Sequence, residues 1–169
     1  LEVGSGNGHF LVKKALENPQ INYIGVEIKE KRIIRCREKQ VRFNAGNVKW
    51  ICGEAFETLK QSFTDNSISI IYMIFPDPWP KRRHHKHRLF NRSFIDLIYS
   101  RLVSHGIFIF ITDFTEYFKA SFKLVLTDKR FELFTQDSIN FDEFTCSFFG
   151  EKWKQDNRDF YGFILKRLQ

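Results

Sequence analysis

Short apolar runs alternate with longer amphipathic segments along the whole chain. The apolar runs are rich in β-branched and aromatic residues, as is typical of strands, and they predict strands at 1–3, 21–28, 47–52, 67–75, 106–112, 131–136 and 160–166. The segments with helical spacing predict helices at 9–17, 29–45, 54–63, 91–103 and 114–127. Regular alternation of the two kinds of element predicts an α/β fold with a doubly wound sheet.

Two of these segments carry further expectations. The run 67–75 is too continuously apolar for a surface strand, so we expect it inside a parallel sheet. The segment 29–45 is charged and amphipathic, and we expect Ile33, Ile34, Val41 and Phe43 on or near its inner face. In doubly wound sheets ligands bind outside the carboxyl ends of the strands. Polar residues that directly follow a predicted strand are therefore candidate site residues.

The first candidate is a glycine-rich turn, in which Gly4, Gly6 and Gly8 follow a strand and precede a helix. Glycine lets the backbone turn sharply and lets a ligand approach the main-chain N–H groups. The dinucleotide fingerprint would require glycine or alanine at position 9, where this chain has His9. The pattern is instead E-x-G-x-G-x-G, and the acid Glu2 suits a ligand with an ammonium group better than a pyrophosphate. A tight turn without any ligand is the alternative.

Two further acids follow the next strands. Glu27 lies at the tip of the second strand, where an acid can bind the two hydroxyls of a ribose, and a solvated charge is the alternative. Glu54 follows the third strand and could accept from an adenine amino group, although for the isolated residue a charge at a helix N-terminus is the better explanation. Taken together, Glu2, the glycines and Glu27 favour a cofactor that contains adenosine.

The fourth strand ends in the unusual sequence "FPDPWP" at 75–80. Pro76 and Pro78 each fix φ and restrict the preceding residue, so they stiffen the backbone on both sides of Asp77 and aim its carboxylate. Trp79 offers an aromatic face on which a nucleic-acid base could stack. A rigid turn whose tryptophan fills the core is the alternative, but three prolines in five positions favour a functional loop.

A cationic tract, "KRRHHKHR" at 81–88, follows at once. It contains no carboxylate, and its cations would repel a metal ion, so we do not expect a metal at its three histidines. Contacts to RNA phosphates explain the tract better than a solvated loop does. The net charge of +7 and the pI near 9.4 also favour a polyanionic partner.

The remaining composition sets broad limits. The 169 residues fit a single domain spanning 1–169, and because the chain opens at Leu1 within a strand end we expect a natural N-terminal segment to be missing. No apolar run approaches the ~20 residues that span a bilayer, so no membrane partner is expected. Three widely spaced cysteines without a CxxC pair favour a reducing cytoplasm.

The glycine pattern with Glu2 and Glu27 resembles the class I S-adenosylmethionine-dependent methyltransferases. The stretch "FPDPWPKRRHHKHRL" (75–89), with "TDFTEYF" (112–118), is similar to the bacterial tRNA (guanine-N7)-methyltransferases, which modify a guanine in the tRNA variable loop. The resemblance implies a Rossmann-like methyltransferase sheet, mostly parallel with an antiparallel strand near the C-terminus. It also implies S-adenosylmethionine as cofactor and tRNA as partner of a monomer or weak homodimer, with guanine 46 as the methylated base.

The resemblance also implies roles for individual residues. Asp77 matches the family's catalytic residue, and cofactor contacts are expected at Glu2, Gly4, Gly6, Gly8, Glu27, Glu54 and Asp77. Substrate contacts are expected at Trp79, Lys81, Arg82, Arg83 and Asp113. Near the C-terminus the family has T-x-(F/Y)-E where this chain has "SFFGEKW". Gly150 occupies the position of the acid, so Ser147 or Glu151 is expected to replace it.

Two other functions stay open at this point. One is methylation of an exocyclic amine of a nucleic acid, since amino methyltransferases carry a similar short motif after the fourth strand but lack the basic extension. The other is a non-catalytic RNA-binding module with a relic cofactor pocket, against which the intact glycines and acids speak.

Overall fold

The computed structural model describes residues 1–144, 156 and 158–169. The chain divides into two compact units, the first formed by Leu1–Thr58 with Asn140–Arg158 and the second by Leu59–Ile139 with Asp159–Gln169. None of the helices in the described ranges has the length and apolar character needed to cross a membrane.

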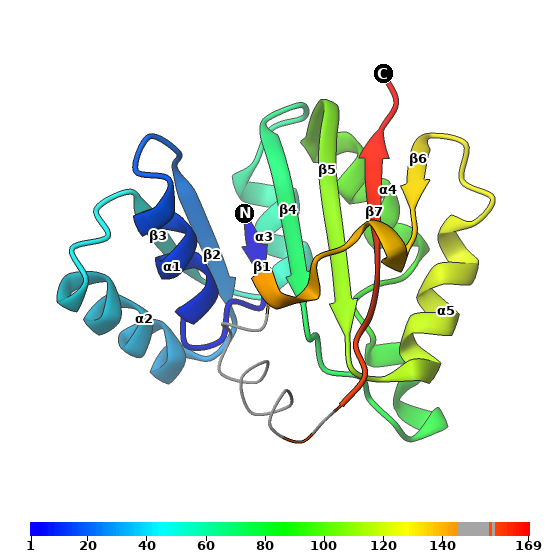
Figure 1. Cartoon of the computed structure of the whole chain (residues 1–169), viewed down its shortest axis with the longest axis horizontal. Helices are drawn as coiled ribbons and strands as arrows, with labels where there is room; N and C mark the ends of the chain where they lie inside the picture. Colours follow the sequence, from blue (N-terminus) through cyan, green and yellow to red (C-terminus); the bar gives the residue numbers. More distant parts are fainter. Residues whose placement is uncertain (145–155, 157) are drawn as a thin grey trace. The chain divides into compact units, whose positions relative to one another are not determined.

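The first unit contains three parallel strands in the order β3-β2-β1. Its elements are β1 (Glu2–Val3), α1 (His9–Glu17), β2 (Tyr23–Glu27), α2 (Glu30–Arg42), β3 (Val48–Cys52) and the short 3-10 helix η3 (Phe141–Glu143). Figure 1 shows α1 and α2 alongside β2 and β3. In the strand register Glu2 pairs with Gly25 and Glu27 with Cys52. The parallel strands therefore bring the glycine turn and Glu27 to the same edge of this sheet.

The second unit contains four strands in the order β4-β5-β7-β6. Its elements are β4 (Ile68–Ile74), η1 (Arg82–His87), α4 (Arg92–Arg101), β5 (Leu102–Thr112), α5 (Thr115–Val125), β6 (Phe131–Phe134), η2 (Gln136–Ser138) and β7 (Tyr161–Arg167). Helix α3 (Ala55–Ser62) belongs in part to each unit. Strands β4 and β5 are parallel, whereas β7 runs antiparallel to both β5 and β6. The predicted antiparallel strand near the C-terminus is confirmed.

Aromatic side chains form the core of the second unit. Phe110 stacks on Phe163 with ring centroids 5.1 Å apart, and Tyr117 meets the Phe110 ring edge-on at 5.4 Å. Phe90 packs against both Phe108 and Phe110, and all five rings are almost completely buried. Because Phe90 lies two residues beyond Arg88, this core anchors the far end of the basic tract.

The sequence predicts the order of the elements correctly, but its prediction for the inner face of α2 is confirmed only for Ile33 and is wrong for Ile34, Val41 and Phe43. Ile33 and Cys36 are the buried residues of this helix, whereas Ile34, Val41 and Phe43 are 50%, 80% and 48% exposed. Successive helical residues are turned by about 100°, so Ile34 and Val41 share a side turned away from Ile33. Residues 82–87 of the basic tract, for which the sequence predicted no helix or strand, form the 3-10 helix η1.

Candidate functional site

The glycine turn lies between β1 and α1 and is hydrogen-bonded to the neighbouring strand β2. The backbone N–H groups of Gly4 and Ser5 donate to the Val26 carbonyl over 2.8 and 3.0 Å. Gly4 and Gly6 have φ values of +74° and +56°, and a Cβ on either would meet nothing within 4 Å. Their backbone therefore borders open space, as a ligand cradle requires. Gly8, with φ +73°, differs because a Cβ there would lie 2.7 Å from the Trp50 ring.

The Glu27 carboxylate is hydrogen-bonded to this turn. Its side chain is 4% exposed, and Oε2 accepts a hydrogen bond from the Gly6 N–H at 3.0 Å and from Arg32 Nη1 at 3.4 Å. Oε1 accepts from the Lys29 N–H at 3.0 Å. The alternative of a solvated charge at the strand end is therefore wrong. The carboxylate lies beside the glycine turn, as the prediction of a ligand-binding acid requires.

Glu2 lies buried at the start of the same turn. The residue is 4% exposed, and its Oε2 atom has no hydrogen-bond partner among the described residues. Burial raises the pKa of Glu2 to about 8, with a smaller raising effect from the Glu27 carboxylate, while the chain's amino group acts in the opposite direction. A buried polar atom without a partner is costly. A cationic ligand at this position would relieve that cost.

The raised pKa of Glu2 leads to a prediction about stability. The unfolded chain ionises at the ordinary pKa of 4.5 and the folded chain at about 8, so the folded state holds an extra proton between these values. This contribution lowers the free energy of unfolding as the pH rises through that window. We expect Glu2→Gln to remove it, so the variant gains stability relative to wild type as the pH rises from about 4.5 to 8.

Urea denaturation of both proteins across the same pH range measures this difference. A difference in stability that does not change with pH would contradict the prediction.

Glu54 has the helix-terminal role that the sequence left open. Its two carboxylate oxygens accept from the N–H groups of Phe56 at 3.1 Å and Glu57 at 2.8 Å, at the first turn of α3. The side chain is exposed, and capping of this kind satisfies donors that the helix itself leaves unpaired. A contact between Glu54 and a cofactor stays a prediction, and it would compete with these two hydrogen bonds.

The loop after β4 is strained on both sides of Asp77. Phe75 has φ +50° and Trp79 has φ +45°, values that side chains of this size rarely adopt. Each such residue costs about 1–3 kcal/mol and is typical of functional sites. The Phe75 N–H donates to the Ile111 carbonyl at 2.7 Å, which ties the loop to β5, and Asp77 itself is exposed. The prolines thus form part of a loop that holds Asp77 at the carboxyl end of β4.

Arg88 is hydrogen-bonded to this loop. Sequence reasoning did not single out this residue. The residue is 8% exposed, and its Nε donates to the Pro78 carbonyl at 2.8 Å. Its Nη2 lies 3.1 Å from His85 Nε2, and its guanidinium lies 4.8 Å from the centre of the Tyr117 ring. One signal in the sequence could have found it: Arg88 is the tract residue next to the apolar pair Leu89-Phe90.

The other Lys and Arg residues of the basic tract face solvent, whereas His84 and His85 are partly buried. Lys81, Arg82 and Arg83 are exposed, and the Lys81 carbonyl accepts from the His84 N–H at the start of η1. Trp79 is 37% exposed, so it does not fill the core as the alternative supposed. Its ring packs against His87 and His84, with centroids 5.1 and 5.8 Å away.

The remaining predictions concern Asp113, the substrate contacts near the C-terminus and the absence of a metal site. Asp113 directly follows β5, the strand parallel to β4, so it lies at the same edge of the second unit's sheet as the Asp77 loop. Ser147, Gly150 and Glu151 lie outside the described residues. Within the described ranges, no group of His, Cys, Asp and Glu is arranged to hold a metal ion.

The fold is similar to that of the Rossmann-like methyltransferases. A 30S ribosomal methyltransferase from an uncultured bacterium matches with a TM-score of 0.68 at 19% identity, over 99% of this chain and 86% of that chain. The sequence model of the family described as "Putative methyltransferase" matches residues 1–163.

Curated relatives name the family more closely. The tRNA (guanine-N7)-methyltransferase of Chlorobium phaeobacteroides is 33% identical over 100% of this chain and 81% of the relative. That of Buchnera aphidicola is 37% identical over 74% of this chain and 52% of the relative. The chain belongs to the bacterial tRNA (guanine-N7)-methyltransferase family. It spans about half the length of several of the curated relatives that it matches.

Proposed function

We propose that this protein transfers a methyl group from S-adenosylmethionine to N7 of a guanine in the tRNA variable loop, at guanine 46. The observation that carries the proposal is the exposed Asp77 carboxylate, held on a strained loop directly before the basic tract, in a chain of this family. Because tRNA is the substrate, we expect the protein to act in the cytoplasm, as a monomer or weak homodimer.

The glycine turn suits the proposed cofactor. S-adenosylmethionine carries a positive sulfonium and a positive amino group, and the buried Oε2 atom of Glu2 lacks a partner among the described residues. Open space borders Gly4 and Gly6, and Glu27 lies beside them. When bound, the cofactor supplies an electrophilic methyl group. Glu2 would offset its positive charge, and Glu27 would bind the ribose hydroxyls.

The chemistry requires positioning more than acid–base catalysis. Guanine N7 carries a lone pair in the plane of the ring and no proton, so no base has to act before it attacks. Holding the reacting atoms in line can itself remove much of the barrier. The purine becomes cationic as the methyl group arrives. Asp77 would stabilise that charge and accept hydrogen bonds from guanine N1–H or N2–H₂.

The residues after Asp77 would bind the RNA. Trp79 would stack on the splayed-out base, and Lys81, Arg82 and Arg83 would contact phosphates. Asp113 would contact the substrate from the end of β5, and we propose the same for Ser147 or Glu151. Substitution of Asp77 should therefore mainly slow methyl transfer, whereas substitution of the exposed cations Lys81, Arg82 and Arg83 should mainly weaken tRNA binding.

Arg88 is proposed as the residue that positions this loop. Arg88→Lys keeps the positive charge but loses the planar group that donates to Pro78 and packs on Tyr117. We expect about a tenfold slower single-turnover methyl transfer, since small misplacements of reacting groups have effects of this size or larger. The salt dependence of tRNA binding should not change. A lower tRNA affinity with unchanged transfer at saturation would instead make Arg88 an RNA ligand.

Analysis of the reaction product tests the proposed function. The protein is incubated with S-adenosylmethionine labelled in its methyl group and with unmodified tRNA, and the nucleosides are then separated. The proposal predicts label in 7-methylguanosine. Label in a nucleoside methylated on an exocyclic amine would overturn it in favour of amine methylation. Binding of tRNA without any incorporation would favour a non-catalytic RNA-binding module.

A further inference from the structure

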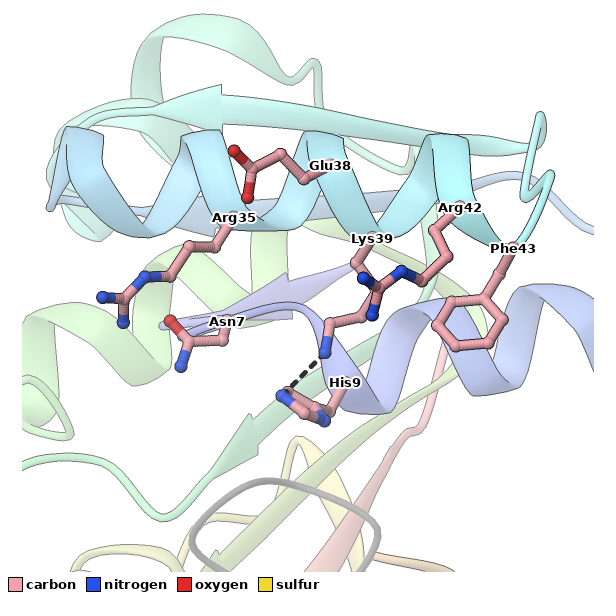
Figure 2. Close-up of a pocket in the computed structure, with 7 residues that line it drawn as sticks. All are labelled: Asn7, His9, Arg35, Glu38, Lys39, Arg42 and Phe43. Atoms are coloured by element: carbon pink, nitrogen blue, oxygen red, sulfur yellow. Dashed lines mark hydrogen bonds between the residues drawn. The ribbon is translucent and has the colours of Figure 1, made fainter.

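A cationic groove in the first unit borders the glycine turn, because its lining residue Asn7 lies between Gly6 and Gly8. The entry to α1 and the side of α2 enclose a cavity of about 450 Å³, lined by Asn7, His9, Arg35, Glu38, Lys39, Arg42 and Phe43. In Figure 2 Lys39 reaches from α2 to His9, Arg42 lies beside Lys39 and Arg35 extends past Asn7, while the Glu38 carboxylate points away from these cations. The groove therefore presents mainly positive charge.

The three cations Arg35, Lys39 and Arg42 destabilise their own helix by mutual repulsion. Arg35, Lys39 and Arg42 are spaced i, i+4 and i+7, so they line one side of α2, and like charges at this spacing repel. No carboxylate in the described part of the chain forms an ion pair with Arg35 or Arg42. Lys39 Nζ lies 2.7 Å from His9 Nε2, so His9 accepts there from a donor-only ammonium group. For Arg35 and Arg42 no ion pair among the described residues offsets this repulsion, and a local cost of that kind points to a function.

The composition of the groove indicates its ligand. S-adenosylmethionine carries no phosphate and is itself positively charged, so a cluster of cations does not suit it. Clustered guanidinium and ammonium groups are typical of phosphate recognition. Phe43 adds an aromatic ring that is 48% exposed, and cations with aromatic rings are typical of single-stranded nucleic-acid grooves. The apolar residue that the sequence placed in the core is thus available to a base.

We propose that this groove binds the phosphodiester backbone of the RNA substrate, with Arg35, Lys39 and Arg42 on phosphates and Phe43 against a base or ribose. It is a second RNA contact, made by residues other than those of the basic tract at 81–88. The proposal rests on the proposed function only in that tRNA supplies the polyanion. Its test is therefore a binding measurement that does not depend on methyl transfer.

The central comparison uses two double variants of α2 that each remove two positive charges from exposed residues. Arg35→Gln with Arg42→Gln alters the groove, and Lys31→Gln with Arg37→Gln is the matched control outside it. For the groove variant we expect tRNA affinity at physiological salt to fall at least tenfold, and the slope of log Kd against log salt to decrease by about 1.5. The control should change affinity about twofold or less, and neither should alter S-adenosylmethionine affinity.

A third variant separates stacking from charge. Phe43→Ala should weaken tRNA binding while leaving the salt slope unchanged, because it removes a ring and no charge.

Equal tRNA affinities of the groove variant and its control would overturn the proposal, even if the wild-type protein forms 7-methylguanosine. Weaker RNA binding by the groove variant would support it even if wild type forms none. Weaker binding to phosphatidylserine vesicles with tRNA binding unchanged would assign the groove to membranes and also overturn it.

Discussion

Replacing Asp77 with asparagine is expected to slow methyl transfer by about 10²- to 10³-fold in single-turnover experiments with both substrates saturating. The asparagine retains the shape of the side chain and a hydrogen-bond acceptor, but it loses the negative charge that would stabilise the cationic purine. The strained loop and the Arg88 hydrogen bond to Pro78 involve main-chain atoms, so they should persist in the variant. The lower rate would then result from the lost negative charge and not from a displaced loop.

Asp137→Asn is a suitable control, because it removes an exposed carboxylate from the second unit outside the proposed site. It should transfer methyl groups at the wild-type rate. S-adenosylmethionine affinity is measured separately for each protein, since Asp77 is also a proposed cofactor contact. Near-wild-type turnover of Asp77→Asn would refute the proposed role of this carboxylate.

Gly8→Ala is expected to lower the free energy of unfolding by roughly 2–4 kcal/mol. Two costs add at this position. The φ of +73° strains any residue with a Cβ, and that Cβ would lie 2.7 Å from the Trp50 ring and 3.0 Å from Cys36 Sγ. Relief would require Trp50 to shift, although its Nε1 donates to Gln40 at 2.8 Å and its ring also packs against Gly25.

Gly4→Ala provides the matched comparison for Gly8→Ala. Its φ of +74° is almost the same, but a Cβ there meets nothing within 4 Å. It should therefore lose only the backbone cost, about 1 kcal/mol. Urea denaturation with equal m-values compares the two variants. Equal losses would show that contact with Trp50 does not determine the effect.

The sequence predicts the parts of the fold that depend on regular patterns. Alternating apolar and amphipathic segments predict the strands and helices in their correct order, and the antiparallel β7 follows from the family resemblance. The glycine turn and Glu27 could also be predicted, because a strand, a tight turn and a helix place them at one sheet edge. The structure adds that Glu27 is held by Gly6 and Lys29 instead of facing solvent.

Other features depend on contacts that a pattern does not contain. Apolar residues alone did not indicate the buried side of α2, because Cys36 takes the place expected of Ile34. The positive φ values at Phe75 and Trp79 arise from how the loop is tied to β5 and to Arg88. For Arg88 the sequence offers only its position beside the apolar pair Leu89-Phe90. Its burial against Tyr117, which separates it from the other cations of the tract, is visible only in the structure.

Substitution of a single atom in the substrate tests the central claim most directly. A tRNA is assembled with 7-deazaguanine at the variable-loop guanine, which replaces N7 by a C–H group and leaves the exocyclic amine intact. With labelled S-adenosylmethionine, the protein should methylate the unmodified tRNA and leave the substituted tRNA unlabelled, although it binds both with equal affinity. Equal labelling of the two tRNAs would contradict the account, because the methyl group would then be placed on an atom other than that N7.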